Sequence, residues 1–204
     1  MYIPKAFRED DLKILHKLMR EYSFATLVTQ QDGVPVATHL PFLLDCGRGP
    51  YGTLKAHMAR GNTQWKSFNC EQEALVIFQG PHAYISPSWY EVELSVPTWN
   101  YAAVHAYGVP EIIEDNAVLY DLLKALIQKH EAQFEKPWDF QLPDDYLQKM
   151  MRGIVGFEIR ITHLEGKFKM SQNRTAVEQQ QMIAALRDSQ DGLNNGVAEL
   201  MSEM

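Results

Sequence analysis

Residues 96–108 alternate between two kinds of side chain, as an extended strand with two different faces requires. One face is aromatic and polar, and it carries Trp99, Tyr101, Ala103, His105 and Tyr107. The other face is small and flat, and it carries Asn100, Ala102, Val104 and Ala106. The first face offers more ligand-facing chemistry than a plain core strand needs, so the segment predicts a strand that borders a binding site.

A second dense run, residues 166–174, contains two lysines, an arginine and two side-chain amides. Lysine and arginine donate to anionic groups, and amides recognise the edges of polar rings. Taken with the strand at 96–108, this run points to a flat, anionic, heteroaromatic ligand.

The rest of the chain is rich in short extended segments joined by tight turns. Strands are expected at 24–30, 34–44, 51–55, 74–79, 82–86, 99–113 and 155–161. Gln31-Asp32-Gly33 is a hairpin signal. The run 47–52 satisfies G-x-G-x-x-G, but Pro50 interrupts it and a strand follows, so a hairpin loop is expected there. Six to seven antiparallel strands with flanking helices predict a mainly β protein, a closed or split β-barrel.

Helices are expected around the ends of the strand-rich body. Asp10 or Asp11 is placed to cap the first helix. Asn62 is placed to cap a short helix at 62–68, and Asp115 is placed to cap an amphipathic helix. A short helix is predicted at 146–151, a tail helix at about 175–187, and, after a break at 194–196, a final turn. The sequence therefore predicts one domain over 1–204 with a helical tail over about 175–204.

Composition narrows the class of protein. The chain has 204 residues, of which 46% are hydrophobic, and no apolar run approaches the roughly 20 residues of a membrane helix. The N-terminus lacks the pattern of a secretory signal, and Cys46 and Cys70 are the only cysteines, so a cytoplasmic protein is expected. The net charge of −7 disfavours tight, direct nucleic-acid binding, although it leaves DNA possible as a partner.

Neither a metal site nor a catalytic centre emerges from the sequence. The seven histidines are scattered without ligand-pair spacing, and His16 and His130 are expected on exposed helix faces. No motif nominates a nucleophile or a general base. Any chemistry would therefore belong to a bound cofactor.

Six separate blocks, in the same order, give the chain a specific resemblance to the PaiB family. They are residues 1–4, 37–41, 57–65, 80–86, 96–108 and 166–174. That family is described as FMN-binding negative transcriptional regulators, related to the split-barrel flavoproteins typified by pyridoxamine 5′-phosphate oxidase. The resemblance implies an FMN-binding split barrel that forms a homodimer with flavin sites at the subunit interface. One departure is Thr63, where the family usually has Pro.

The resemblance and the side-chain chemistry together suggest how FMN would be held. Hydroxyl, imidazole and guanidinium donors suited to the phosphate come from Thr53, His57 and Arg60. The strand carrying Thr38 and His39 is expected along the isoalloxazine. An aromatic wall and an amide for the ring come from Trp99 and Asn100. Donors that close the site, with the partner subunit as an open alternative source, come from Lys169, Gln172 and Asn173.

Structural roles compete with several of these assignments. Trp99 is as readily explained as barrel core, because tryptophan is commonly buried for packing alone. Asn62 is better explained as a helix cap than as a ligand. Lys169 and Arg174 are also typical of solvated charges at a strand end.

Three functions remain open at this point. The resemblance implies a regulator that represses gene expression, directly or indirectly, although no helix-turn-helix signature is evident. The alternative is an FMN-dependent oxidoreductase acting on an unidentified small molecule, which leaves the question of enzymatic activity open. A flavin-binding module without chemistry is the third.

Overall fold

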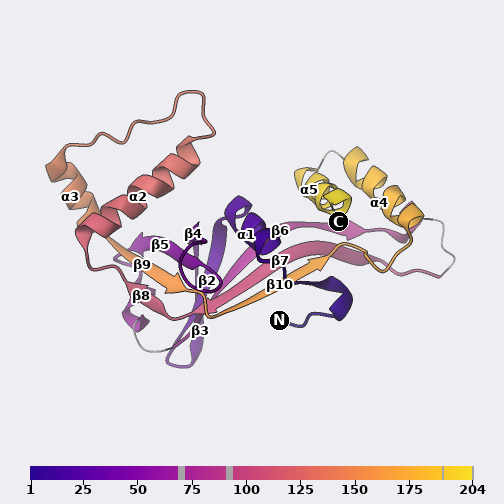
Figure 1. Cartoon of the computed structure of the whole chain (residues 1–204), viewed down its shortest axis with the longest axis horizontal. Helices are drawn as coiled ribbons and strands as arrows, with labels where there is room; N and C mark the ends of the chain where they lie inside the picture. The colour runs from indigo at the N-terminus through magenta and orange to yellow at the C-terminus, as the bar shows by residue number, and fades with distance from the viewer. Residues whose placement is uncertain (69–71, 91–93, 190, 204) are drawn as a thin grey trace. The chain divides into compact units, whose positions relative to one another are not determined.

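Ten strands form two sheets in the part of the chain that this computed structural model describes, residues 1–68, 72–90, 94–189 and 191–203. The six-stranded sheet has the order β1 (Arg8–Glu9), β10 (His163–Lys169), β7 (Thr98–Gly108), β6 (Ala74–Ile85), β2 (Phe24–Gln31) and β3 (Val34–Pro41). The four-stranded sheet has the order β4 (Leu43–Asp45), β5 (Thr53–Ala59), β9 (Ile154–Arg160) and β8 (Pro110–Ile112). This architecture confirms the mainly β prediction (Figure 1).

Five α-helices and three short 3-10 turns accompany the sheets within the described residues. The helices are α1 (Leu12–Glu21), α2 (Asn116–Glu131), α3 (Asp144–Arg152), α4 (Ala176–Asp188) and α5 (Gly192–Glu203). The 3-10 turns are η1 (Lys5–Phe7), η2 (Thr63–Ser67) and η3 (Pro87–Trp89). No helix among these residues has both the length and the apolar character needed to cross a membrane.

The chain groups into two compact units, each assembled from separate stretches of sequence. Unit 1 contains residues 1–15, 79–104 and 165–204, and unit 2 contains residues 16–78 and 105–164. Strands β6 and β7 each begin in one unit and end in the other, so the boundary falls inside strands. The single domain over 1–204 stays a prediction.

The core of unit 2 is built around phenylalanine rings. The Phe42 ring centroid lies 5.9 Å from that of Phe78 and 6.2 Å from that of Phe157. Phe68 packs on Phe157 with 4.9 Å between the centroids. These rings are at most 4% exposed, so they anchor the strands that carry them.

The β2–β3 hairpin of unit 2 turns at the predicted residues. Asp32 and Gly33 have φ angles of 53° and 78°, and Gln31 pairs with Val34 across the turn. A two-residue hairpin loop of this kind requires positive φ at both positions, which aspartate tolerates and glycine favours. The Asp-Gly signal is therefore confirmed.

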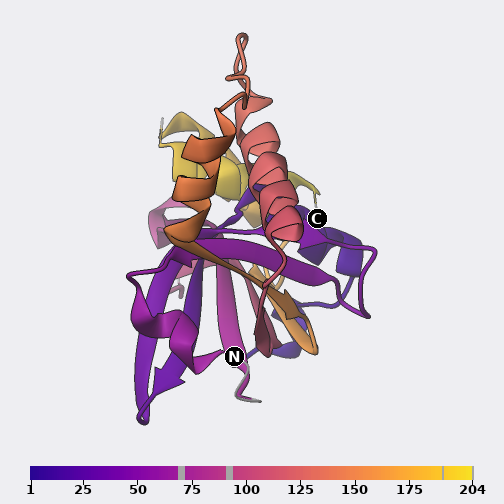
Figure 2. The same ribbon diagram turned by 90° about the vertical axis from the view of Figure 1, so that its left-hand side faces the viewer.

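Helices α2 and α3 lie side by side over the four-stranded sheet of unit 2 (Figures 1 and 2). Their buried residues form one hydrophobic cluster, which consists of Leu119, Leu122 and Leu126 of α2 and Met151 of α3. As predicted, Asp115 caps α2, because its Oδ1 accepts the N–H of Ala117 at 2.7 Å. The helix pair covers the sheet face on which the polar residues of β5 lie.

Helices α4 and α5 of unit 1 pack against each other (Figure 1). Thr175 and Glu178 form a reciprocal capping box that fixes the start of α4. The predicted break at 194–196 is wrong, because α5 runs through these residues from Gly192. Asp191 sets that start by accepting the N–H of Leu193 at 2.8 Å. Burial of the Val197 face of α5 outweighs the low helix propensity of Asn-Asn-Gly.

Other local predictions also need correction. The segments 74–79 and 82–86 form one strand, β6, that continues through Gly80-Pro81. The segments 34–44 and 99–113 each divide into two strands, and β1 and β10 were not predicted. The count therefore rises from six or seven to ten.

Two further helix caps in the N-terminal half of the chain are confirmed, whereas the predicted exposure of His16 is not. Asp11 caps α1 by accepting the N–H of Lys13 at 2.8 Å, and Asn62 caps η2 by accepting that of Gln64. His16 is only 9% exposed, so the prediction of an exposed face is wrong. Its Nε2 lies 2.9 Å from the carbonyl oxygen of Tyr51, which satisfies the buried ring.

Candidate functional site

Unit 1 presents aromatic side chains on one face of its sheet. Trp99 of β7 is 53% exposed, and its ring centroid lies 6.1 Å from His82 and 5.9 Å from Tyr84, both on β6. Tyr101 lies on the same face of β7, with the Lys167 ammonium 5.1 Å from its ring centroid. We call His82, Tyr84, Trp99 and Tyr101 the aromatic face. Exposed aromatic groups of this kind are typical of a binding surface.

Lys169 of β10 places a cation beside this face. Its Nζ donates to the carbonyl oxygen of Trp99 at 2.8 Å and also to the hydroxyl of Thr98. Burial lowers the pKa of the Lys169 ammonium, and the charge of Lys167 lowers it further. A partly desolvated ammonium next to an exposed indole suits a planar ligand that carries carbonyl or anionic groups.

Asn100 lies on the opposite, buried face of β7, as the alternation predicts. Its Nδ2 donates to Ser171 Oγ at 3.0 Å and to Met201 Sδ at 3.5 Å. Its Oδ1 accepts the Ser171 hydroxyl at 3.1 Å. Because Asn100 is 0% exposed and its amide is engaged, the geometry favours a structural role.

The turn after β10 contains the other predicted residues of unit 1. Gln172 closes this turn, since its Nε2 donates to the carbonyl of Phe168 and its Oε1 accepts the N–H of Met170. Asn173 is exposed in the same turn. Unit 1 thus brings Trp99, Lys169 and this turn together.

In unit 2, Thr38 belongs to an internal polar network. Its hydroxyl donates to Gln64 Oε1 at 2.6 Å and accepts from Asn62 Nδ2 at 2.9 Å. His39 is exposed, with its Nδ1 2.9 Å from the hydroxyl of Thr26. Their strand, β3, ends the six-stranded sheet, so its outer backbone edge is the part that a ligand can use.

Three polar residues share the face of β5 that α2 and α3 cover. Thr53 is buried and donates to the carbonyl of Arg48 at 3.0 Å. Lys55 Nζ lies 3.1 Å from Asp45 Oδ2 and borders a cavity of about 700 Å³. The buried Nδ1 of His57 has no hydrogen-bond partner among the described residues, and burial lowers the pKa of its ring.

Lys55 was assigned no role from the sequence, although Thr53 and His57 on either side of it were predicted to bind the phosphate. Alternation would have found it, because Thr53, Lys55 and His57 are two residues apart and share one face of a strand. His82 and Tyr84 were similarly given no role, although they alternate toward the aromatic face.

The residues predicted to bind the FMN phosphate do not all lie close enough together to bind one phosphate. Thr53 and Arg60 are seven residues apart along an extended segment, a separation of about 23 Å at a rise of ~3.3 Å per residue. One phosphate cannot touch both side chains. Thr53 and Arg60 therefore belong to different parts of unit 2.

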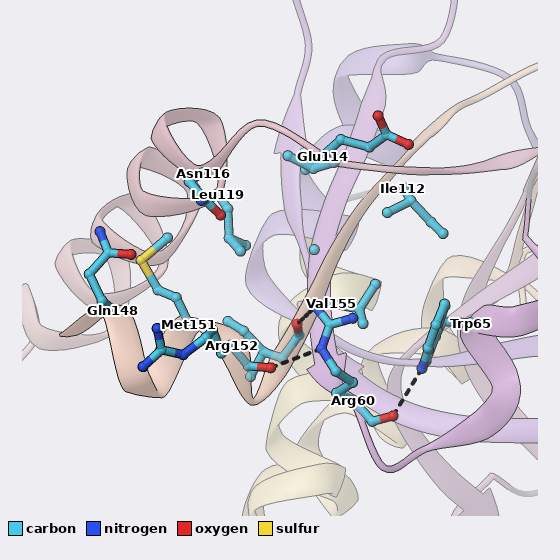
Figure 3. A pocket seen from close by; sticks show the side chains of 13 residues that line it. Arg60, Trp65, Ile112, Glu114, Asn116, Leu119, Gln148, Met151, Arg152 and Val155 are labelled. Atoms are coloured by element: carbon cyan, nitrogen blue, oxygen red, sulfur yellow. Dashed lines mark hydrogen bonds between the residues drawn. The ribbon is translucent and has the colours of Figure 1, made fainter. Parts of the chain in front are cut away.

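Arg60 follows β5 and lines a cavity of about 450 Å³ (Figure 3). Its Nε and Nη2 donate to the carbonyls of Arg152 and Ile154, both at 2.8 Å. Its guanidinium carbon lies 5.8 Å from the Trp65 ring centroid, and the Trp65 indole donates to the Arg60 carbonyl. This arrangement fixes the guanidinium at the cavity wall.

The histidines do not combine into a metal site in the described part of the chain. No group of three or more histidine, cysteine, aspartate or glutamate side chains has the geometry to hold a metal ion there. What the described residues offer is an aromatic face with a neighbouring ammonium in unit 1, and cationic groups along β5 in unit 2. These chemistries fit a flavin ring and a phosphate.

Comparison with known proteins places the chain in a family. Residues 1–163 match the family model described as "Putative FMN-binding domain". The chain is 39% identical to the protease synthase and sporulation protein PAI 2 of Bacillus subtilis, over 100% of this chain and 97% of that protein. It is 30% identical to the uncharacterized protein AN0679 of Emericella nidulans, with the same coverage.

Solved structures with low sequence identity share the fold. The FAD and heme binding protein from Mycobacterium smegmatis aligns with a TM-score of 0.63 at 18% identity, covering 87% of this chain and 79% of that one. The flavocytochrome Anf3 from Azotobacter vinelandii aligns with a TM-score of 0.59 at 15% identity, covering 86% and 73%. With the two-sheet architecture, these alignments confirm the split-barrel prediction. The chain therefore belongs to the PaiB family of proteins with an FMN-binding split-barrel domain.

Proposed function

We propose that this protein binds FMN and acts as a negative regulator of transcription. The observation that carries the proposal is the match of residues 1–163 to the FMN-binding family model, together with the PaiB resemblance. The aromatic face and its neighbouring ammonium supply the kind of surface that a flavin ring requires. The role in transcriptional repression is proposed because the resemblance to the PaiB family implies it.

The flavin contacts are assigned by their chemistry. The isoalloxazine ring stacks on Trp99, and Lys169 donates to its carbonyl edge, while Gln172 and Asn173 border that edge. On β3, the backbone beside Thr38 and His39 supplies further polar contacts. Lys55, between Thr53 and His57, is the ammonium assigned to the phosphate. As the resemblance implies, the flavin sites lie at the interface of a homodimer, and the partner supplies part of each one.

Purified protein is expected to show the visible absorption bands of an oxidised flavin and to release FMN on denaturation. Lys55→Met removes a charge-assisted hydrogen bond, which contributes about 1.5–3 kcal/mol, so FMN affinity should fall about tenfold or more. Trp99→Leu removes the stacking surface and should cost about 0.5–1.5 kcal/mol of binding free energy. Equilibrium titration of apoprotein with FMN, followed by flavin fluorescence, measures both losses.

A matched control is Lys66→Met, which removes the same charge at an exposed position of η2. Its FMN affinity should equal that of the unaltered protein. Mixing the Lys55→Met and Trp99→Leu proteins tests the shared interface, because a mixed dimer would regain one unaltered site if each flavin draws on both subunits. Colourless protein that also fails to take up added FMN would refute the cofactor assignment.

Repression is tested in the organism that encodes the protein. Deleting the gene should raise the transcripts of its target genes, and the unaltered gene should restore repression. The Lys55→Met gene should restore it poorly, whereas the Lys66→Met gene should restore it fully. Unchanged transcripts across the genome would reject the regulatory role. Rapid flavin reduction by NADH or NADPH in the purified protein would then favour the oxidoreductase.

A further inference from the structure

We propose that the cavity beside Arg60 binds a small organic carboxylate at a site separate from the flavin. The cavity has a volume of about 450 Å³ and lies entirely within unit 2. Pockets of about 300–1,000 Å³ are typical of small-molecule sites. The inference rests on the residues that line this cavity and stands without the flavin assignment.

Arg60 is held in place before any ligand arrives. Two of its five N–H groups donate to the carbonyls of Arg152 and Ile154, and the Trp65 ring flanks the guanidinium. The remaining three N–H groups are not used in these contacts. A guanidinium that is already ordered loses little conformational entropy when it binds a carboxylate.

A second arginine adds to the positive charge of this cavity. Arg152, at the end of α3, also lines the cavity, with its guanidinium on the α3 side and pointing away from that of Arg60 (Figure 3). Within the described residues, neither Arg60 nor Arg152 forms an ion pair with a carboxylate. Asn116, at the first turn of α2, and Gln148 of α3 also line the cavity, so side-chain amide groups are available to an anion.

The rest of the lining decides what else the ligand must carry. Most of the remaining wall is apolar and comprises Ile112, Ile113, Leu119, Met151, Ile154 and Val155. Glu114 supplies one negative charge at the rim, which disfavours ligands with several negative charges, such as a nucleotide phosphate. The combination selects a monocarboxylate with an aromatic or branched apolar body.

Binding is tested by calorimetric titration of the purified, flavin-loaded protein with 3-phenylpropionate. We expect saturable binding, with 3-phenylpropionamide at least about tenfold weaker because it lacks the charge. Arg152→Met should weaken the carboxylate about tenfold or more. Gln148→Trp, which fills the cavity from an exposed position of α3, should abolish binding.

Arg187→Met is the control, since it removes an arginine that bonds Ser202 in unit 1. It should bind 3-phenylpropionate as tightly as the unaltered protein does. Arg60→Lys keeps the charge but loses the paired carbonyl contacts, so it should also weaken binding. A thermal unfolding curve for each variant shows that the fold is retained.

Three results of the titrations with flavin-loaded protein would overturn the proposal. They are the absence of binding at millimolar 3-phenylpropionate, equal affinity for the amide, and unchanged affinity in Arg152→Met. Displacement of the carboxylate by FMN in apoprotein would also overturn it, because the cavity would then belong to the flavin. Failure to bind FMN, in contrast, would reject the cofactor assignment and leave this site untouched.

Discussion

Replacing Gly108 by alanine should destabilise the protein by about 3 kcal/mol or more. A Cβ atom at this position would lie 2.3 Å from the carbonyl oxygen of Arg160 and 2.7 Å from Ile159 Cγ2. The backbone has little freedom to withdraw, because the N–H of Thr162 donates to the carbonyl of the preceding Tyr107 at 2.9 Å. Urea denaturation followed by circular dichroism would measure the loss of unfolding free energy.

The matched control for this substitution is Gly61→Ala. A Cβ at Gly61 meets no atom within 4 Å, so the free energy of unfolding should change by less than about 1 kcal/mol. If Gly108→Ala proved as stable as Gly61→Ala, the close approach between the end of β7 and residues 159–160 would be refuted.

Asn100→Asp is expected to cost about 3–5 kcal/mol at neutral pH, because it places an uncompensated carboxylate at a position with 0% exposure. The Ser171 hydroxyl could still donate to the new oxygen, but the donors that Nδ2 directs to Ser171 and Met201 would be lost. The fold would therefore favour the protonated acid and raise its pKa above the value in the unfolded chain.

This shift gives the loss a definite pH dependence. A carboxyl whose folded pKa is raised is fully tolerated below its unfolded pKa, about 3.9, and stability is lost as pH rises toward the folded pKa. Urea denaturation at about pH 5 and about pH 8 should therefore show a larger deficit at the higher pH. Asn100→Leu, which introduces no charge, should show a deficit that does not vary with pH. Equal deficits for Asn100→Asp at both values would contradict the burial of this amide.

Local patterns predicted the faces of the strands well. Asn100, Ala102, Val104 and Ala106 are all 0% exposed, as the alternation along β7 requires. Val155, Phe157, Ile159 and Ile161 are at most 3% exposed, so one face of the strand predicted at 155–161 is buried. Alternation is a reliable signal because one face of each strand is buried, and this burial requires apolar or small side chains at every second residue of the local sequence.

Local signals failed where contacts between distant residues outweighed them. Gly80-Pro81 is typical of a turn, yet strand pairing on both sides holds β6 continuous. The donors of Asn100 and Arg60 are engaged by residues 71 and 92 positions away, Ser171 and Arg152. Such long-range hydrogen bonds decide which polar groups remain free to bind a ligand. The sequence could therefore nominate candidate site residues, but it could not separate ligand-binding residues from structural ones.

The boundary between the two units has a practical consequence for genetic dissection. Unit 1 is encoded by three separate stretches of the gene and unit 2 by two, and the junctions after residues 78 and 104 fall within β6 and β7. A single truncation would sever a hydrogen-bonded strand before it removed either unit. Chimeras with a relative should therefore exchange all the stretches of one unit together, because a simple crossover would recombine parts of both.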